Sequence, residues 1–75
     1  MKKSCVVYLA VDQGGLESMF FYKPSRGRRM WHDDTIFGSG VPAQILASGS
    51  IERMIGRRLG WSDEPVAVCI NENGL

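Results

Sequence analysis

The segment 4–11, with the sequence SCVVYLAV, constrains the fold more than any other part of the chain. It is short, rich in β-branched residues, and apolar on both alternating sides of an extended backbone. A strand with one exposed face alternates apolar with polar residues, whereas a strand buried on both faces is apolar throughout. The sequence therefore predicts a central strand here, buried on both sides.

A β-hairpin is predicted from the residues that follow. Residues 12–15 (DQGG) supply a turn, because glycine adopts positive φ without steric cost. Residues 16–22 (LESMFFY) return to strand-type side chains, and Pro24 ends that strand because proline cannot donate a ladder hydrogen bond. We expect residues 25–29 to form a turn or loop, and residues 29–32 to add a short edge strand.

The helix signal lies near residue 55. Apolar residues recur one helical turn apart between Ile51 and Leu59, so they form one face of a helix. We expect Ser48 or Ser50 to cap its first N–H groups. Gly60 is expected to follow the last turn, because glycine readily takes the left-handed conformation found there.

The remaining segments complete the fold class. Residues 33–49 carry mixed signals, with residues 43–47 as an extra strand or a turn of helix. Residues 66–70 (VAVCI) predict a last buried strand, followed by a polar tail. We therefore expect one small α+β domain over residues 1–75. It would have a three- to four-stranded, mainly antiparallel sheet with one helix, in the order strand, strand, optional strand, helix, strand.

Charge and hydropathy exclude several classes of protein. Nine Lys and Arg residues against eight Asp and Glu residues give a net charge of +1, which argues against a strongly electrostatic binder of nucleic acid or anionic membrane. The apolar run 5–11 is too short for an export signal, and no run approaches the ~18 residues of a membrane span. We expect a cytoplasmic protein.

The polar residues do not form a pattern typical of catalysis. Neighbouring side chains at positions 32–34 (HDD) alternate sides of an extended chain, so we expect a solvated loop there. The segment 38–40 (GSG) lacks the flanks of a phosphate loop or a nucleophile elbow. Catalytic, cofactor and metal sites are therefore predicted to be absent. An enzyme built around His32 or Ser39 is the least favoured hypothesis.

The two cysteines are expected to be structural. Cys5 and Cys69 each lie in an apolar run, so we expect free, buried thiols that serve as small hydrophobic side chains. A disulfide between neighbouring strands is the alternative. Neither cysteine belongs to a Cys-x-x-Cys motif or a Cys/His cluster, which makes a structural zinc site a poor fit.

The candidate contact residues are basic and aromatic. Arginine binds phosphate or carboxylate through two parallel hydrogen bonds, and an aromatic ring stacks on a nucleic-acid base. The alternative is that the helix arginines form its exposed side and that the loop is charged for solubility. The predicted binding residues are Lys23, Arg26, Arg28, Arg29, Trp31, Arg53, Arg57, Arg58 and Trp61.

Parts of the chain resemble a group of small proteins of bacteriophages and gut bacteria that has no assigned activity. The resemblance is carried by the segments 8–12 (YLAVD), 23–26 (KPSR), 50–59 (SIERMIGRRL) and 61–66 (WSDEPV), of which the last two are the more specific. It implies a mobile genetic element as context and names no catalytic residues. Residues 33–47 depart from the pattern.

Two functions from different classes are compatible with these observations. The first is a non-enzymatic protein-binding module, which the generous supply of Met and aromatic side chains favours. In one form of this hypothesis it is a phage-encoded inhibitor that acts stoichiometrically on a host defence complex. The alternative is a nucleic-acid or nucleotide-phosphate binder that uses the basic and aromatic residues. A homodimer through a strand edge or an aromatic face is a further expectation, because the core is small.

Overall fold

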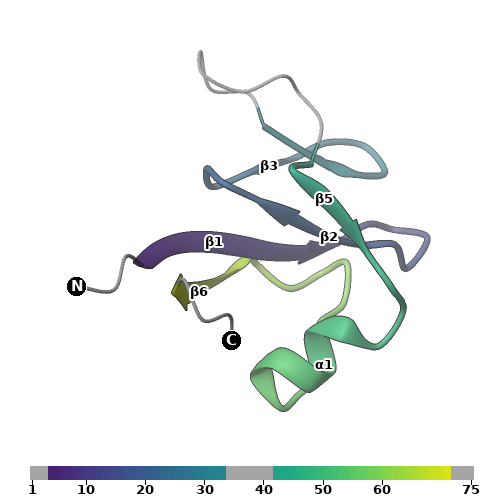
Figure 1. Ribbon diagram of the computed structural model, residues 1–75. Coiled ribbons are helices and arrows are strands. Elements are labelled where there is room, and N and C mark those ends of the chain that lie inside the picture. Colours follow the sequence, from purple (N-terminus) through teal and green to yellow (C-terminus); the bar gives the residue numbers. More distant parts are fainter. Residues whose placement is uncertain (1–3, 34–41, 72–75) are drawn as a thin grey trace.

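The computed structural model describes residues 4–33 and 42–71. Within them the chain forms strands and a single short helix, with the helix below the sheet in the view of Figure 1. The elements are β1 (Ser4–Val11), β2 (Glu17–Phe20), β3 (Ser25–Arg26), β4 (Trp31–His32), β5 (Gln44–Leu46), α1 (Ser50–Ile55) and β6 (Val66–Asn71). No helix of the described segments is long and apolar enough to cross a membrane.

Four of the strands form one antiparallel sheet in the order β5-β2-β1-β6. In its register Leu9 lies opposite Met19 of β2 on one side and Val66 of β6 on the other. β3 and β4 pair separately as a two-stranded hairpin. The predicted α+β class, with a small antiparallel sheet and one helix, is confirmed.

β1 is the centre of this sheet and contributes to apolar clusters on both of its faces. Leu9 and Val11 pack with Ile51 of the helix on one face. Ala10 packs with Phe20 and Trp31 on the other face. The prediction of a central strand buried on both sides is therefore confirmed for the second half of β1.

The second hairpin docks on the end of β1 through hydrogen bonds between backbone groups and one carboxylate. The backbone N–H of Gln13 donates to the carbonyl oxygen of Arg29 at 2.9 Å. The backbone N–H of Trp31 donates to Oδ1 of Asp12, also at 2.9 Å. The turn between β1 and β2 thus holds the turn between β3 and β4.

Several predicted strand boundaries are wrong. β2 ends at Phe20 rather than at residue 22, and Ser25–Arg26 is a strand instead of a loop. The N–H of Gly27 donates to the carbonyl oxygen of Met30 at 2.9 Å, and this tight turn lets β3 pair with β4. A Cβ at Gly27 would lie 2.8 Å from that oxygen, so the turn requires glycine.

Two expectations for other segments were sound only in part. The region 43–47 contains the strand β5, which was one of the two alternatives considered. The strand predicted over 66–70 is present and continues through Asn71, but it lies at the sheet edge and residues 66–69 are half-buried or exposed, so its predicted burial is wrong. Cys69 is free and exposed, so the predicted burial of its thiol is wrong. The side chain of Cys5 lies outside the described part of the chain.

The helix is shorter than its apolar periodicity predicted. It ends at Ile55, because Gly56 takes the left-handed conformation at φ 79° and its N–H donates to the carbonyl oxygen of Glu52 at 2.8 Å. Gly56 therefore fills the role expected of Gly60. Arg57 and Arg58 follow the helix and do not form its last turn.

The N-terminus of α1 is capped from another element rather than by a neighbouring serine. Gly49 occupies the cap position with φ 88°, and no side chain of its own neighbourhood caps the helix. Instead Glu17 of β2 accepts the N–H of Gly49 at 2.7 Å with one oxygen and that of Ile51 at 2.8 Å with the other. A carboxylate there also meets the positive end of the helix dipole.

This cap predicts a measurable loss of stability. Glu17→Ala removes both acceptors, and we expect the free energy of unfolding to fall by about 1–2 kcal/mol, the upper range for loss of a helix cap. Glu17→Gln keeps one acceptor oxygen and should lose less. Urea unfolding followed by circular dichroism measures both. Glu64→Gln, an exposed carboxylate away from the helix, serves as the control and should change stability by under about 0.5 kcal/mol.

Candidate functional site

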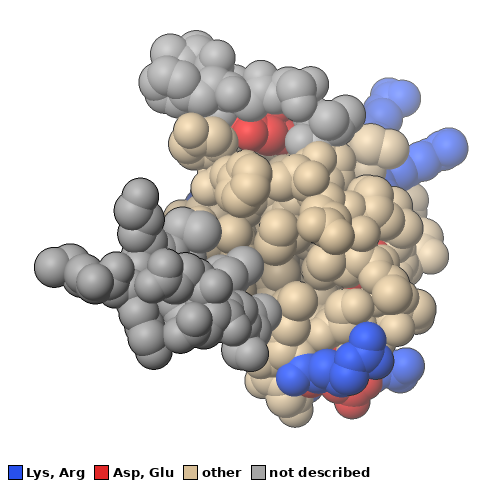
Figure 2. Space-filling view, in the orientation of Figure 1, with Lys and Arg blue, Asp and Glu red and all other residues tan. Residues whose placement is uncertain are grey.

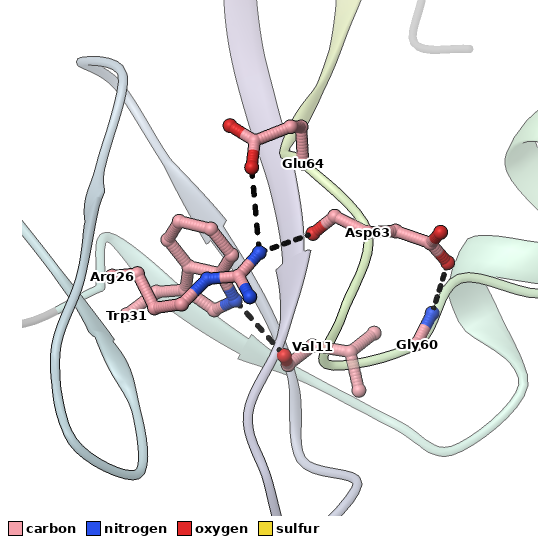
Figure 3. A network of polar contacts seen from close by, with 6 residues as sticks. All are labelled: Val11, Arg26, Trp31, Gly60, Asp63 and Glu64. Carbon is pink, nitrogen blue, oxygen red and sulfur yellow. Dashed lines mark hydrogen bonds and ion pairs between the residues drawn. The ribbon is translucent and has the colours of Figure 1, made fainter.

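Trp31 lies at the junction of the second hairpin and the sheet. Its side chain is only 3% exposed and packs against Ala10 and Phe20. The indole N–H donates to the carbonyl oxygen of Val11 at 2.9 Å (Figure 3). A buried ring with its only donor satisfied belongs to the core, so Trp31 is not available to stack on a nucleic-acid base.

Arg26 covers Trp31 and also contacts Trp61. Its guanidinium carbon lies 4.6 Å from the ring centroid of Trp31 and 5.0 Å from that of Trp61. The two rings meet edge to face, with centroids 5.7 Å apart. Nη2 of Arg26 donates to the carbonyl oxygen of Asp63 at 3.3 Å and to Oε2 of Glu64 at 3.4 Å (Figure 3). We call Arg26, Trp31 and Trp61 the arginine–tryptophan cluster.

This cluster brings together three of the nine residues predicted to bind a partner. They interact with one another, since the cation lies over the aromatic faces and its fork is directed at main-chain and carboxylate oxygens. The arrangement joins the β3–β4 hairpin to the segment before β6. Its evident role is structural.

The other six predicted residues are exposed and lie at two different places. Figure 2 shows the Lys and Arg side chains of this face in two groups, one at the upper right and one at the bottom, separated by uncharged surface. Arg58 makes a loose ion pair with Glu52 at 3.7 Å. The six residues are Lys23, Arg28 and Arg29 near the second hairpin, and Arg53, Arg57 and Arg58 at and after α1.

A groove of about 540 Å³ lies between the β1–β2 turn, the start of α1 and the segment before β6. Its apolar lining comes from β1, from α1 and from the segment between α1 and β6. Four carboxylates and one guanidinium also line it, for a formal charge of −3. The apolar lining residues are Val11, Ile51, Leu59 and Trp61. The charged lining residues are Asp12, Glu17, Glu52, Asp63 and Arg58.

Most of these carboxylates already hold the backbone in place. Oδ1 of Asp12 accepts the N–H of Trp31, and both oxygens of Glu17 cap the helix. Oδ2 of Asp63 accepts the N–H of Gly60 at 2.8 Å. Glu52 is the exception, because its contact is the loose pair with exposed Arg58. The groove is therefore a pre-formed acidic surface, well suited to attract a positive charge.

Sequence reasoning missed this groove, because its acidic residues are far apart in the chain. A partial signal existed. Asp12 precedes a glycine pair and Glu52 lies in the first helical turn, which are both positions where a carboxylate usually contacts backbone N–H groups. Nothing in the sequence indicates that the end of β1 and the start of α1 face each other.

The candidates for catalysis are not assembled into a site within the described residues. His32 is half-buried in β4, so the solvated loop predicted for it is wrong. Asp33 follows the strand without regular structure but is buried, so its predicted solvation is wrong. Asp34 and the segment 38–40 lie outside the described residues. No group of three or more His, Cys, Asp or Glu side chains in residues 4–33 and 42–71 could hold a metal ion.

The arginine–tryptophan cluster yields a stability prediction. Arg26→Ala removes two ring contacts and two hydrogen bonds, and we expect the free energy of unfolding to fall by about 1–2 kcal/mol. The tryptophan emission should shift to longer wavelength as water reaches the rings. Arg26→Lys should recover only part of the loss, because an ammonium lacks the planar fork. Arg28→Ala, an exposed neighbour, is the control, and an equal loss there would refute a specific role for Arg26.

Comparison with known proteins adds no family assignment. No family model, curated protein or solved structure matches this chain. The functions of the groove and of the exposed surfaces are therefore inferred from their own contacts, charges and shape.

Proposed function

We propose that the protein is a non-enzymatic binding module that holds a basic segment of a protein partner in its acidic groove. The observation that carries this proposal is the composition of the groove, in which apolar side chains lie beside an excess of carboxylates. Three of these carboxylates are committed to backbone N–H groups, which leaves their charge in place and their geometry fixed. Such a surface favours binding over chemistry.

The apolar and the acidic lining of the groove fit the aliphatic stem and the charged end of a lysine or arginine side chain, respectively. The aliphatic stem of such a side chain packs on apolar surface while its charged end stays near polar groups. Leu59 and Trp61 would contact the stem, and Glu52 would meet the charged end from the rim. Carboxylates that are fixed before binding lower the entropy that a partner must lose.

The partner that we propose is a host protein, an enzyme or defence complex, that the protein blocks stoichiometrically in the bacterial cytoplasm. This part of the proposal rests on the resemblance that we expect, from the segments 50–59 and 61–66, to small proteins of bacteriophages and gut bacteria. It also agrees with a surface that exposes several large apolar side chains, which are Val6, Leu16, Phe21, Tyr22, Met30, Ile45 and Met54.

The geometry gives less support to the alternative of a nucleic-acid or nucleotide-phosphate binder. That hypothesis required Arg26 and Trp31 to face a ligand, and they instead face each other. Arg58, one of the exposed arginines near α1, lines the groove, whose excess of carboxylates would repel a phosphate chain.

A peptide titration tests the groove. We expect a short peptide rich in lysine and arginine to change the emission of Trp61, which lines the groove, and to bind more weakly as salt is raised. Glu52→Gln should weaken binding about two- to fivefold, the effect expected for one exposed ion pair. Glu64→Gln is matched in charge and lies outside the groove lining, so it should bind like the unmodified protein.

The same pair of variants identifies a natural partner. A host protein that is retained from a bacterial lysate by the unmodified chain and by Glu64→Gln, and is reduced with Glu52→Gln, would be a ligand of the groove. Equal binding of the basic peptide and an acidic peptide of the same length would contradict the proposal. Tighter binding of a single-stranded oligonucleotide, with steep salt dependence, would favour the alternative.

A further inference from the structure

The two outer strands of the sheet differ in how well they are protected from pairing with another strand. β5 has only three residues, and a short edge strand is one of the usual means of blocking edge-to-edge association. A proline precedes each edge strand, Pro42 before β5 and Pro65 before β6, so the difference between the edges lies in their length. β6 has six residues and no charged side chain, and it pairs with β1 along one edge only within the described sheet.

We propose that the free edge of β6 pairs with the β6 strand of a second copy of this chain, in antiparallel orientation about a two-fold axis. In β6 the N–H and C=O groups of alternate residues point away from β1, and no strand of residues 4–33 or 42–71 pairs with them. A second copy would continue the sheet through the seam, in the strand order β5-β2-β1-β6-β6-β1-β2-β5. This inference does not depend on the function proposed for the groove.

Charge favours a second copy as the occupant of this edge. In a two-fold antiparallel pair, residues near the axis lie opposite themselves or their near neighbours, so any charge there meets a like charge. The sequence of β6, VAVCIN, places no charge at any of these positions. The whole chain carries a net charge of only +1, so long-range repulsion between two copies is small.

The side chains beside the seam are also compatible with self-association. Ala67 and Cys69 are exposed, and they lie opposite Tyr8 and Val6 of β1, so all four are on the face away from α1. Val6 is 46% exposed. Pairing two β6 strands would join two such uncharged surfaces into one. The groove lining includes no residue of β6, so the strand pairing itself involves no lining residue.

The alternation of side chains between the two faces of the sheet limits which residues of the two β6 strands can lie opposite each other. Residues opposite each other in a strand pair lie on the same face, and successive residues alternate faces. A two-fold axis at the middle of β6 pairs Val68 with its own copy and Ala67 with Cys69, and an axis one residue to either side pairs Ala67 or Cys69 with its own copy. In each of these three registers, lysines at positions 67 and 69 would place two ammonium groups opposite each other.

Light scattering after gel filtration tests the proposal under reducing conditions, from micromolar to millimolar concentration. We expect the mass to rise from the 8.3 kDa of one chain toward twice that value. The double variant Ala67→Lys with Cys69→Lys should remain monomeric at every concentration. Both positions are exposed, so circular dichroism should show an unchanged fold.

The opposite edge provides a matched control. The double variant Gln44→Lys with Ile45→Lys adds the same charge to two exposed positions of β5 and should still dimerise. A monomeric mass for the unmodified chain at all concentrations would overturn the proposal, as would a dimer that survives lysines at 67 and 69. Binding of the basic peptide by the monomeric variant would separate this result from the function of the groove.

Discussion

The docking of Trp31 against the end of β1 is the interaction on which the rest of the structure depends. Its ring closes the second apolar cluster, and its backbone and indole N–H groups both bind the region of Val11 and Asp12. Arg26 and Trp61 then stack on the same ring. One side chain thereby fixes the second hairpin and the segment before β6 to the central strand. A core this small has few other contacts that could do so.

The acidic groove shows how a small fold can combine stability with a binding surface. Asp12, Glu17 and Asp63 each satisfy backbone N–H groups at turns and at the start of the helix. Because a hydrogen-bonded carboxylate retains its negative charge, the groups that hold the loops together also set the potential of the groove. Among the four carboxylates of the groove, that of Glu52 accepts no backbone hydrogen bond and makes a loose surface ion pair with Arg58.

Local sequence patterns predicted the features that depend on neighbouring residues, such as the central strand. They failed for features that depend on contacts between residues far apart in the chain. The fully apolar pattern of residues 4–11 identified the central strand correctly. The helical periodicity was real, but Gly56 ended the helix a full turn before Gly60. Arg26 was expected to face a ligand, because the sequence shows its positive charge but not which residues it contacts. Its position over Trp31 depends on a hairpin that brings the two together, and sequence spacing does not encode that contact.

The cap that Glu17 provides for α1 has a consequence for the order of folding. A helix of six residues is far too short to persist alone in water, and here its first N–H groups find their acceptor on a strand more than thirty positions earlier in the chain. The helix can therefore become stable only after β2 has joined the sheet. We infer that the sheet nucleates folding and that α1 is among the last elements to form and the first to open.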